Sequence, residues 1–557
     1  MKRRNAISIM FNLFKLIGSF TLILILAVIM GTIGNLLGNG VLIFASLGVA
    51  KIIDPNYIRL SWGWIISLTI ISGVLKGILK YAEQYSNHFI AFKILAILRD
   101  KIFRKLRELA PANLLDKKKG SIVALVTSDI ETLEVFYAHT ISPICIALLT
   151  SLFMFIFVGS ISNYYLALIL ILGYIIIGVI IPIISSKVYS TSGVEYRETF
   201  SNFSSSYLDF IKGRDEIVLN NKEDEFKDII DTNSTNLLKL NRSIKNKSSI
   251  LIAITNLFVS LTIITVLLIG LLEVTNNNLN IASLAIVVIS ITASFGPVLS
   301  LASLPQNLTQ TLASGNRLIN LMEEEAKVLD IVDKQDFEFE TLEVNHLNFK
   351  YENNNILNDI NFKVEKGTII GLMGESGSGK STILNILLRF FKVEDNMIKY
   401  NGIDINQINT NSLRSNVTMV SQNTYLFRDT ILNNLKIANL NATLDEVKEA
   451  CRKASIDKFI ESLPNKYDTI VSNEEETISA GEKQRLGLAR AFLSGAKLIL
   501  LDEPTSNVDS LNEEIILKSL KDSSIDHSII LVSHRLSSLS ICDKIYHMEN
   551  GKIIEEE

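Results

Sequence analysis

Six long apolar segments occupy the first 300 residues, and each is long enough to cross a lipid bilayer. The hydrocarbon core of a membrane needs about 20 mostly apolar residues in a helix. The segments run over Leu13–Leu37, Ile58–Lys80, Ile141–Ile161, Tyr164–Ser185, Ile250–Leu272 and Ile281–Leu304. The first continues as a softer apolar stretch to Val49, and we expect it to remain uncleaved because five further spans follow it. The pattern predicts an all-α transmembrane domain of six helices.

Lysine and arginine are concentrated in two of the connections between these segments. The connection after the second segment and the one after the fourth are rich in both residues, whereas residues 160–163 and 273–280 contain neither. Positive residues favour the cytoplasmic side of a membrane. We therefore expect both basic loops and both termini in the cytoplasm of a multi-pass protein of the cell membrane. The abundant Asn and Ile are typical of a bacterium with an AT-rich genome.

The two basic loops are too long to be turns. Ile90–Leu109 and Glu216–Leu240 show helical periodicity with charged faces, so we expect the membrane helices to continue into the cytoplasm. Each loop is expected to turn at a short helix that touches the soluble domain, near Pro111–Asp116 and near Ser204–Phe210. The alternative is that both are simply solvated charged helices.

One polar stripe interrupts the second apolar segment. Lys76, Lys80, Gln84 and His88 are four residues apart, so they share a helix face, with Glu83 beside them. The favoured interpretation places them past the inner membrane surface, with the lysines extending to water. The second interpretation is that Gln84 and His88 line a substrate cavity.

The glycines of the membrane half, and the cysteines of the whole chain, add three expectations. The glycines at 31, 34, 38 and 40 either allow close helix packing or loosen the helix end. Gly296-Pro297 is expected to kink the sixth helix. The three cysteines, Cys145, Cys451 and Cys542, fit no metal or redox spacing, and we interpret them as buried thiols.

The last 220 residues read as an α/β domain with a phosphate-binding loop. A predicted strand at Thr368–Met373 leads into the loop, and a predicted helix at Thr382–Phe391 follows it; Thr341–Lys350 is an earlier strand. Glycines let backbone N–H groups curl around phosphates, and the start of the helix adds positive charge. Lys380 would bind the β- and γ-phosphates, and the Ser381 hydroxyl would bind Mg²⁺. The nucleotide-binding residues expected here are Gly374, Glu375, Ser376, Gly377, Ser378, Gly379, Lys380, Ser381 and Thr382.

A second candidate element is the apolar run Lys497–Leu501, which ends in Asp502 and Glu503. It reads as a buried central strand of a parallel sheet. Asp502 can complete the Mg²⁺ shell, and Glu503 is then placed to polarise an attacking water. The alternative, two solvated acids at the end of a strand, is disfavoured by the phosphate loop.

A third element begins at Ser479, which reads as the N-cap of an apolar helix through Leu493. Such a helix start binds anions. A domain with one phosphate loop has no use for a second such site unless two domains face each other.

These elements together resemble the ABC transporters, and specifically the exporter-type half-transporters, over essentially the whole chain. The resemblance rests on an ordered set: Tyr351, Gly374–Ser381, Gln422, Ser479–Gln484, Asp502-Glu503, Ser506–Asp509 and His534. It implies that Tyr351 stacks on adenine, that Gln422 senses Mg²⁺, and that His534 lies at the γ-phosphate. It also implies nucleotide contacts from Ser479, Gly481 and Asp509, and a Mg²⁺ site formed by Ser381, Gln422 and Asp502.

The resemblance further implies the mechanism and a partner. Two ATPase domains would enclose two ATP molecules, with Glu503, His534 and Lys380 as the catalytic residues. Because one chain carries one membrane domain, the working unit would be a dimer. The signature reads Ile478-Ser-Ala-Gly-Glu482, and Ser472-Asn-Glu-Glu475 replaces the usual Gly-Glu-x-Gly. The altered signature beside an intact Glu503 favours a heterodimer over a homodimer.

A finer resemblance concerns the second helix. Lys80–His88, Leu98–Arg104 and Ala110-Pro111 look like the branch that exports cysteine and glutathione for cytochrome bd assembly. The expected domains are a membrane domain (1–315), a linker (316–340) and an ABC ATP-binding domain (341–557).

The leading function is ATP-driven export of a small molecule or peptide. The alternatives are an importer built on the exporter fold and a non-transporting regulatory ABC protein, although intact Lys380, Glu503 and His534 argue against the latter. The net charge of −4 gives no reason to expect a nucleic-acid partner.

Overall fold

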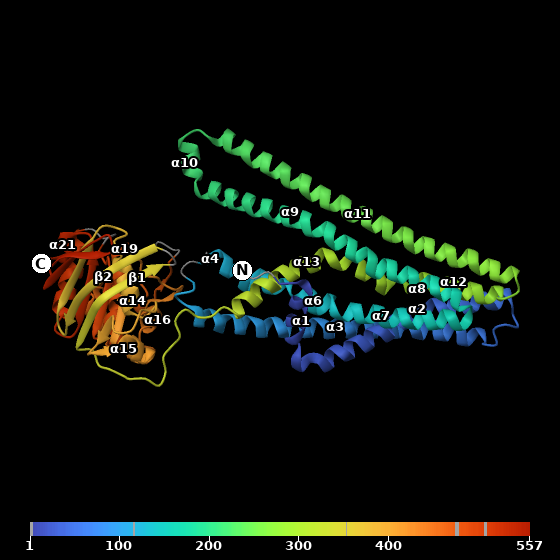
Figure 1. Ribbon diagram of the computed structural model, residues 1–557, viewed down its shortest axis with the longest axis horizontal. Coiled ribbons are helices and arrows are strands. Elements are labelled where there is room, and N and C mark those ends of the chain that lie inside the picture. Colours follow the sequence, from blue (N-terminus) through green and yellow to red (C-terminus); the bar gives the residue numbers. More distant parts are fainter. Residues whose placement is uncertain are drawn as a thin grey trace. The chain divides into compact units, whose positions relative to one another are not determined.

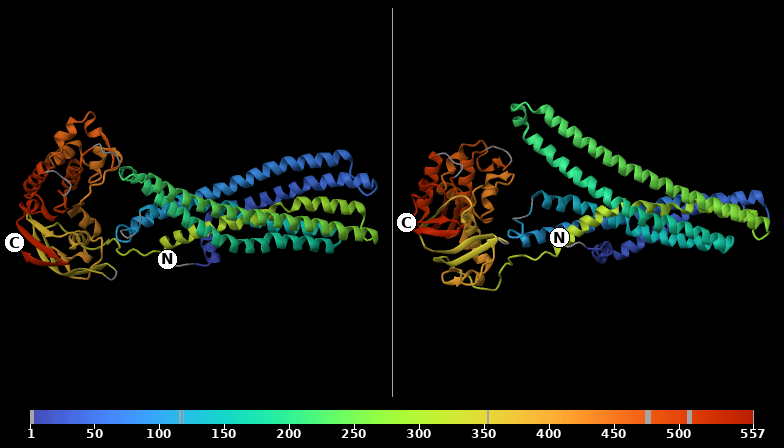
Figure 2. Two further views of the ribbon diagram at one scale, coloured as in Figure 1. Left: turned by 90° about the horizontal axis from the view of Figure 1, so that it is seen from above. Right: turned by 45° about the horizontal axis from the view of Figure 1, so that its top comes forward.

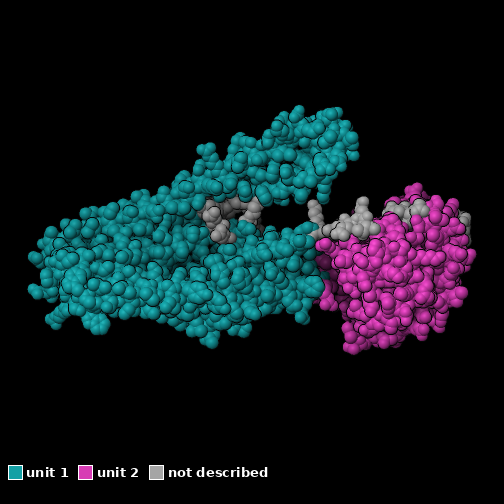
Figure 3. Space-filling view, turned by 180° about the vertical axis from the view of Figure 1, so that it is seen from behind, with its two compact units in different colours: residues 1–106, 117–324 teal, residues 107–116, 325–557 magenta. Residues whose placement is uncertain are grey.

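The computed structural model describes residues 4–114, 117, 119–351, 354–473, 478–505 and 510–556. Side chains at 119, 187–194, 197–198, 306–307 and 555–556 are outside the description. The chain divides into two compact units (Figure 3). Unit 1 comprises residues 1–106 and 117–324, and unit 2 comprises residues 107–116 and 325–557. The domain limits at 315 and 341 stay predictions.

The described residues of the N-terminal part form helices joined by short connections, which confirms the predicted fold class. Among the described residues, six helical segments are long and apolar enough to span a membrane: Gly18–Ile53, Trp62–Leu109, Gly120–Ile161, Tyr164–Ser186, Glu223–Thr275 and Ile281–Pro305. The helices are α1 (Ala6–Lys15), α2 (Thr21–Ile53), α3 (Trp62–Leu109), α4 (Lys119–Ala124), α5 (Ile130–Thr132), α6 (Glu134–His139), α7 (Ile141–Ile161), α8 (Tyr164–Ile175), α9 (Ile181–Lys212), α10 (Arg214–Leu219), α11 (Glu223–Thr275), α12 (Ile281–Ser294) and α13 (Gly296–Met322).

The long helices extend well past the apolar segments, as their charged periodicity predicts. In Figures 1 and 2, α9 and α11 lie side by side and α10 joins them at one end. The expected short turning helix near Ser204–Phe210 is wrong, because these residues lie inside α9 and α10 makes the turn instead. The expected helix at Glu216–Leu240 is interrupted after Leu219, where Asn221 takes a positive φ of 50°.

Glycine and proline shape the helices of unit 1 as their chemistry suggests. A Cβ on Gly34 would lie 3.4 Å from Leu79 Cβ and 3.6 Å from the Lys80 nitrogen, so this glycine lets α2 pack closely on α3. The sixth span breaks at Phe295, between α12 and α13, where Gly296-Pro297 predicts a kink.

The polar stripe on α3 is only partly exposed. Glu83 is buried, and its carboxylate lies 2.6 Å from Lys80 Nζ and accepts a hydrogen bond of 3.1 Å from the Asn87 amide. Lys80 and Gln84 line a cavity of about 340 Å³, whereas His88 contacts Glu134 instead. Lys80 therefore pairs with a buried carboxylate, whereas the favoured interpretation from the sequence had the lysines extending only to water.

Unit 2 is an α/β domain built on two principal sheets. A six-stranded sheet has the order β12-β11-β3-β10-β9-β6 and is parallel except for β12, and a four-stranded antiparallel sheet has the order β2-β1-β4-β5. The strands are β1 (Thr341–Tyr351), β2 (Asn354–Glu365), β3 (Ile369–Gly374), β4 (Ile398–Tyr400), β5 (Ile403–Asp404), β6 (Val417–Val420), β7 (Asp429–Thr430), β8 (Ile470–Val471), β9 (Leu498–Asp502), β10 (Ser528–Ser533), β11 (Lys544–Glu549) and β12 (Lys552–Glu556). The helices are α14 (Lys380–Leu387), α15 (Thr410–Asn416), α16 (Ile431–Lys436), α17 (Leu444–Lys453), α18 (Asp457–Ser462), α19 (Ala480–Ser494), α20 (Ser510–Ser523) and α21 (Leu536–Leu539).

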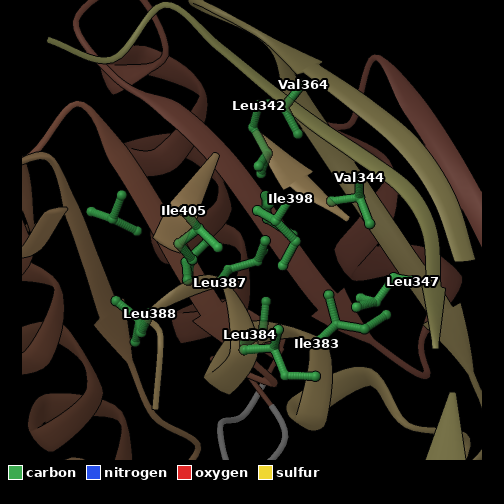
Figure 4. Packing of buried hydrophobic residues seen from close by; sticks show 14 of the residues in the cluster. Leu342, Val344, Leu347, Val364, Ile383, Leu384, Leu387, Leu388, Ile398 and Ile405 are labelled. Carbon is green, nitrogen blue, oxygen red and sulfur yellow. The ribbon is translucent and has the colours of Figure 1, made fainter. Parts of the chain in front are cut away.

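An aliphatic core fixes α14 between the two sheets. Side chains of the antiparallel sheet meet those of α14 in one cluster (Figure 4), which includes Leu342, Val344, Ile398, Ile383, Leu384 and Leu387. All six are essentially inaccessible to solvent. Burial of this size stabilises by roughly 1.5–3 kcal/mol per side chain. The cluster therefore holds the helix that follows the phosphate loop.

The segment after α3 is part of unit 2, in line with the expected contact near Pro111. Ala112 belongs to the same core cluster. The Asn113 amide donates to the Glu325 carbonyl at 3.0 Å, and its oxygen accepts from the Lys327 N–H at 2.9 Å. Through Leu114 the backbone forms turns rather than the expected helix, and residues 115–116 lie outside the description.

Candidate nucleotide-binding site

Four parallel strands bring the candidate residues to one edge of the six-stranded sheet. The phosphate loop follows β3, Gln422 follows β6, Asp502 ends β9, and His534 follows β10. Since the carboxyl ends of parallel strands share an edge, residues far apart in sequence meet there. The topology of the sheet alone therefore brings these residues close together.

The loop between β3 and α14 requires glycine at several positions. Gly377 and Gly379 have φ values of +88° and +101°, which L side chains rarely adopt. A Cβ on Gly374 would lie 2.3 Å from the Met548 carbonyl oxygen, and one on Gly379 would lie 2.6 Å from Leu357. The backbone is therefore free to curl tightly, as phosphate binding by N–H groups demands.

Lys380 is buried and held by its own loop. Its Nζ donates to the carbonyls of Gly374 and Glu375 at 2.8 and 2.6 Å and to Ser378 Oγ at 3.3 Å. Burial lowers the pKa of Lys380, while the carboxylates of Glu503 and Asp502 oppose that shift. The ammonium must release these loop carbonyls to reach a phosphate oxygen.

Ser381 and Asp502 form a pair of oxygen ligands at the end of β9. The Ser381 hydroxyl donates to Asp502 Oδ1 at 3.0 Å. Burial raises the pKa of Asp502, and the Ser381 hydrogen bond partly counters the rise. A hydroxyl and a carboxylate at this spacing fit a hard cation such as Mg²⁺.

Glu503 is held between Gln422 and His534. The Gln422 Nε2 donates to Glu503 Oε2 at 3.1 Å, and His534 Nδ1 lies 3.2 Å from Glu503 Oε1. The backbone of Glu503 has φ +48°, an uncommon value for a residue with a side chain, and its N–H donates to the Val532 carbonyl at 3.0 Å. Three loops therefore orient one carboxylate, which suits a group that must position a water.

Ser479 caps α19 in a reciprocal arrangement with Glu482. The Glu482 N–H donates to Ser479 Oγ at 3.3 Å, while the Glu482 carboxylate accepts from the Ser479 N–H and hydroxyl at 2.7 and 2.8 Å. Ser479 and Gln422 line one cavity of about 770 Å³. Gln484 donates to the Gln422 carbonyl and accepts from Thr424 at 3.1 Å. The signature helix thus supports the loop that carries Gln422.

The structure does not join every predicted residue to this cluster. Tyr351 packs edge-on against Phe349 and Phe391, with ring centroids 5.0 and 5.2 Å apart. Gly481 is buried in the first turn of α19, and Thr382 lies in α14. In the described ranges no hydrogen bond joins Ser479 to the phosphate loop. Asp509, with the rest of Ser506–Asp509, lies outside the described residues.

Two supporting groups were not foreseen from the sequence. Arg490 of α19 donates to the carbonyls of Tyr425 and Asn434 at 2.7 and 2.8 Å and to Asn434 Oδ1 at 2.9 Å, and burial lowers its pKa. An arginine inside the apolar run Leu486–Phe492 was the available signal, because such a charge needs buried partners.

The second group links the strand loops behind the site. Glu513 of α20 accepts from the Ser538 hydroxyl at 2.6 Å, and the hydroxyls of Ser538 and Thr505 lie 2.9 Å apart. Thr505 follows Glu503 by two residues, so this buried network fixes the loop after β9. The scattered Ser and Thr residues gave no sequence signal for it.

Comparison with known proteins agrees with this geometry. Residues 357–506 match the family described as ABC transporter, and residues 13–298 match the ABC transporter transmembrane region. The chain is 41% identical over 552 residues to a "Probable ABC transporter ATP-binding/permease protein" of Haemophilus influenzae, covering 99% of this chain and 100% of the relative.

More distant relatives carry other names. The identity is 28% to an ATP-dependent lipid A-core flippase of Legionella pneumophila, over 95% of this chain and 90% of the relative. The identity to an ATP-dependent lipid A-core flippase of Desulfotalea psychrophila is 29%, over 86% of this chain and 84% of the relative. Six apolar spans and an ATP-binding domain in one polypeptide complete the case: the chain belongs to the ABC transporter family, as an exporter-type half-transporter that couples ATP hydrolysis to membrane transport.

Proposed function

We propose that this protein exports a small polar molecule from the cytoplasm as one half of a heterodimer. The observation that carries the proposal is the Glu503 carboxylate, held by Gln422 and His534 next to Lys380 and the Ser381–Asp502 pair. An intact site of this kind supports turnover and disfavours the regulatory alternative. The basic loops support cytoplasmic termini, and the bacterial relatives support a place in a bacterial cell membrane.

The residues of the site divide the work of ATP hydrolysis. The loop N–H groups and Lys380 bind the phosphates, and Tyr351 stacks on adenine. Glu503 accepts a proton from the attacking water at its carboxylate, and His534 orients Glu503 and contacts the γ-phosphate. Ser381, Asp502 and the amide oxygen of Gln422 would hold Mg²⁺, whose charge would neutralise that of the phosphates. The Gln422 hydrogen bond to Glu503 uses its nitrogen and leaves that oxygen for the metal.

The signature helix favours two unequal sites. In the dimer, Ser479, Gly481 and Asp509 complete the partner's nucleotide site. The Ser479 hydroxyl is engaged by the Glu482 carboxylate at 2.8 Å, and Glu482 also brings negative charge to a phosphate-binding helix start. We infer that the site completed by this signature turns over more slowly than the site containing this chain's Glu503.

The membrane cavity favours a small, polar cargo. The cavity of about 340 Å³ is lined in part by Asn35, Lys80, Glu83, Gln84, His139 and Ser300. The buried Glu83 carboxylate and the exposed Lys80 ammonium beside it suit a molecule that itself carries charge. This agrees with the finer resemblance to the cysteine and glutathione exporters, and it differs from the lipid A-core named for the flippase relatives.

Transport in oriented vesicles tests this proposal. Inside-out vesicles containing the tagged chain and its native partner are given ATP and radiolabelled cysteine or glutathione. We expect ATP-dependent accumulation that is lost in Glu503→Gln. Uptake by right-side-out vesicles loaded with ATP would support the importer instead. ATP hydrolysis that neither thiol changes, with no accumulation, would overturn the proposed cargo.

A further inference from the structure

Three metal-ligating side chains meet in unit 1, away from the nucleotide site. His88 lies on α3, while Glu134 and His139 are the first and last residues of α6. His88 Nδ1 is 3.0 Å from Glu134 Oε1, and the rings of His88 and His139 meet edge to face with centroids 5.2 Å apart. One ligand atom from each residue lies within 4.8 Å of the other two.

The surroundings leave this group available for a ligand. The neighbouring acid, Glu83, is already paired with Lys80 at 2.6 Å and hydrogen-bonded by Asn87. Glu134 is about one-third exposed, as is His88, and His139 is exposed. Partial exposure gives an ion a path to the three side chains without a large rearrangement.

We propose that His88, Glu134 and His139 form a binding site for a late first-row divalent cation of the Zn²⁺ type. Two imidazoles and one carboxylate are a donor set that such ions prefer, and Mg²⁺ or Ca²⁺ would favour oxygen alone. Zinc binds these groups at about 2.0–2.2 Å, so tetrahedral ligands stand about 3.4 Å apart. The His88–Glu134 distance of 3.0 Å is already close, and a ligand atom of His139, which lies within 4.8 Å of the other two, would have to move nearer to them.

Three protein ligands leave one coordination position open. His139 also lines the membrane cavity of about 340 Å³, so the site adjoins that cavity. The open position can take water or a donor atom of a molecule in the cavity, with thiolate sulfur the strongest candidate for such ions. The site stands independently of the proposed cargo, because the ion is held by the chain's own residues.

The ordinary alternative is a structural hydrogen bond between α3 and α6. That role needs only His88 and Glu134, and it gives no reason for a second imidazole to meet the first. A metal requires all three. The two readings therefore differ in what removal of His139 does.

Cobalt binding to the intact transporter tests the site. The full-length protein with its partner, in nanodiscs and freed of metal by a chelator, is titrated with Co²⁺, whose visible spectrum reports four-coordinate geometry. Zn²⁺ is then added in competition. We expect one equivalent of Co²⁺ bound per copy of this chain, displaced by Zn²⁺, and bound at least tenfold more weakly in His88→Ala and His139→Ala.

Two further variants keep the result interpretable. His346→Ala is the matched control, because His346 of unit 2 pairs with a carboxylate, Asp359, at 2.7 Å on an exposed surface, and it should bind Co²⁺ like wild type. Glu134→Gln keeps the size of the side chain and should weaken binding while the protein still elutes as an intact complex. Absence of a Zn²⁺-displaceable spectrum, or equal binding in His139→Ala and His346→Ala, would overturn the proposal and leave a structural contact only.

Discussion

Replacing Glu503 by glutamine isolates its role in hydrolysis. Glutamine has the same size, and its oxygen can still accept from Gln422, so the 3.1 Å contact can persist. What disappears is the negative charge and the proton acceptor. A positioned general base contributes about 10²–10⁴-fold, which corresponds to about 3–5 kcal/mol in the activation barrier. ATP binding should survive because the phosphate loop is unchanged.

The assay combines two measurements on the reconstituted transporter. Phosphate release at saturating ATP should fall at least 100-fold in Glu503→Gln, and ATP should remain bound after rapid gel filtration. Glu449→Gln is the matched control, since Glu449 forms an exposed pair with Arg452 on α17 and the substitution makes the same charge change. Hydrolysis by Glu503→Gln at the wild-type rate would refute the assignment of the base.

Three other variants probe the architecture of the site. Asp502→Asn should abolish Mg²⁺-dependent hydrolysis yet raise the Tm at pH 7. Burial raises the pKa of Asp502 in the folded state, so its charged carboxylate destabilises the fold at neutral pH. The Tm difference between the variant and the wild type should therefore shrink as the pH falls toward 4. Arg490→Leu should lower the stability of the ATPase domain by about 2–4 kcal/mol, seen as a lower Tm by calorimetry, because buried carbonyls lose their donor; an unchanged Tm would contradict this. Gly379→Ala should destabilise by about 1–3 kcal/mol and weaken ATP binding measured by nucleotide titration, whereas Gly402→Ala, also at positive φ but facing open space, should leave ATP binding unchanged.

Much of the architecture follows from sequence because its signals are local. Apolar runs of bilayer length predicted the six spans, and an apolar strand ending in Asp502 placed β9 correctly. Ser479 was identifiable as an N-cap from the residues that follow it, and the structure adds the reciprocal contact with Glu482 three residues later. Each of these features is determined by interactions within a few neighbouring residues, so it can be predicted from the local sequence.

The features that were missed depend on contacts between distant segments. Ser204–Phe210 has the composition of a turn-forming segment, yet it continues α9, and the chain reverses only at α10. The meeting of His88 with His139 depends on how α3 lies against α6, which no periodicity encodes. Arg490 could be recognised as a buried charge, but its acceptors at Tyr425 and Asn434 lie more than 50 residues away.

We expect this half-transporter to hydrolyse ATP only as a dimer whose nucleotide sites need both chains. The most direct measurement is the ATPase rate of the tagged chain purified from its native membrane, taken together with the mass and composition of the particle. We expect an active particle of two half-transporters, this chain with a second one. Hydrolysis should be lost when this chain is separated from the second, because Ser479 has no hydrogen bond to its own phosphate loop in the described ranges and the site containing Glu503 needs the partner's signature helix. A monomeric particle that hydrolyses ATP at the full rate would contradict it.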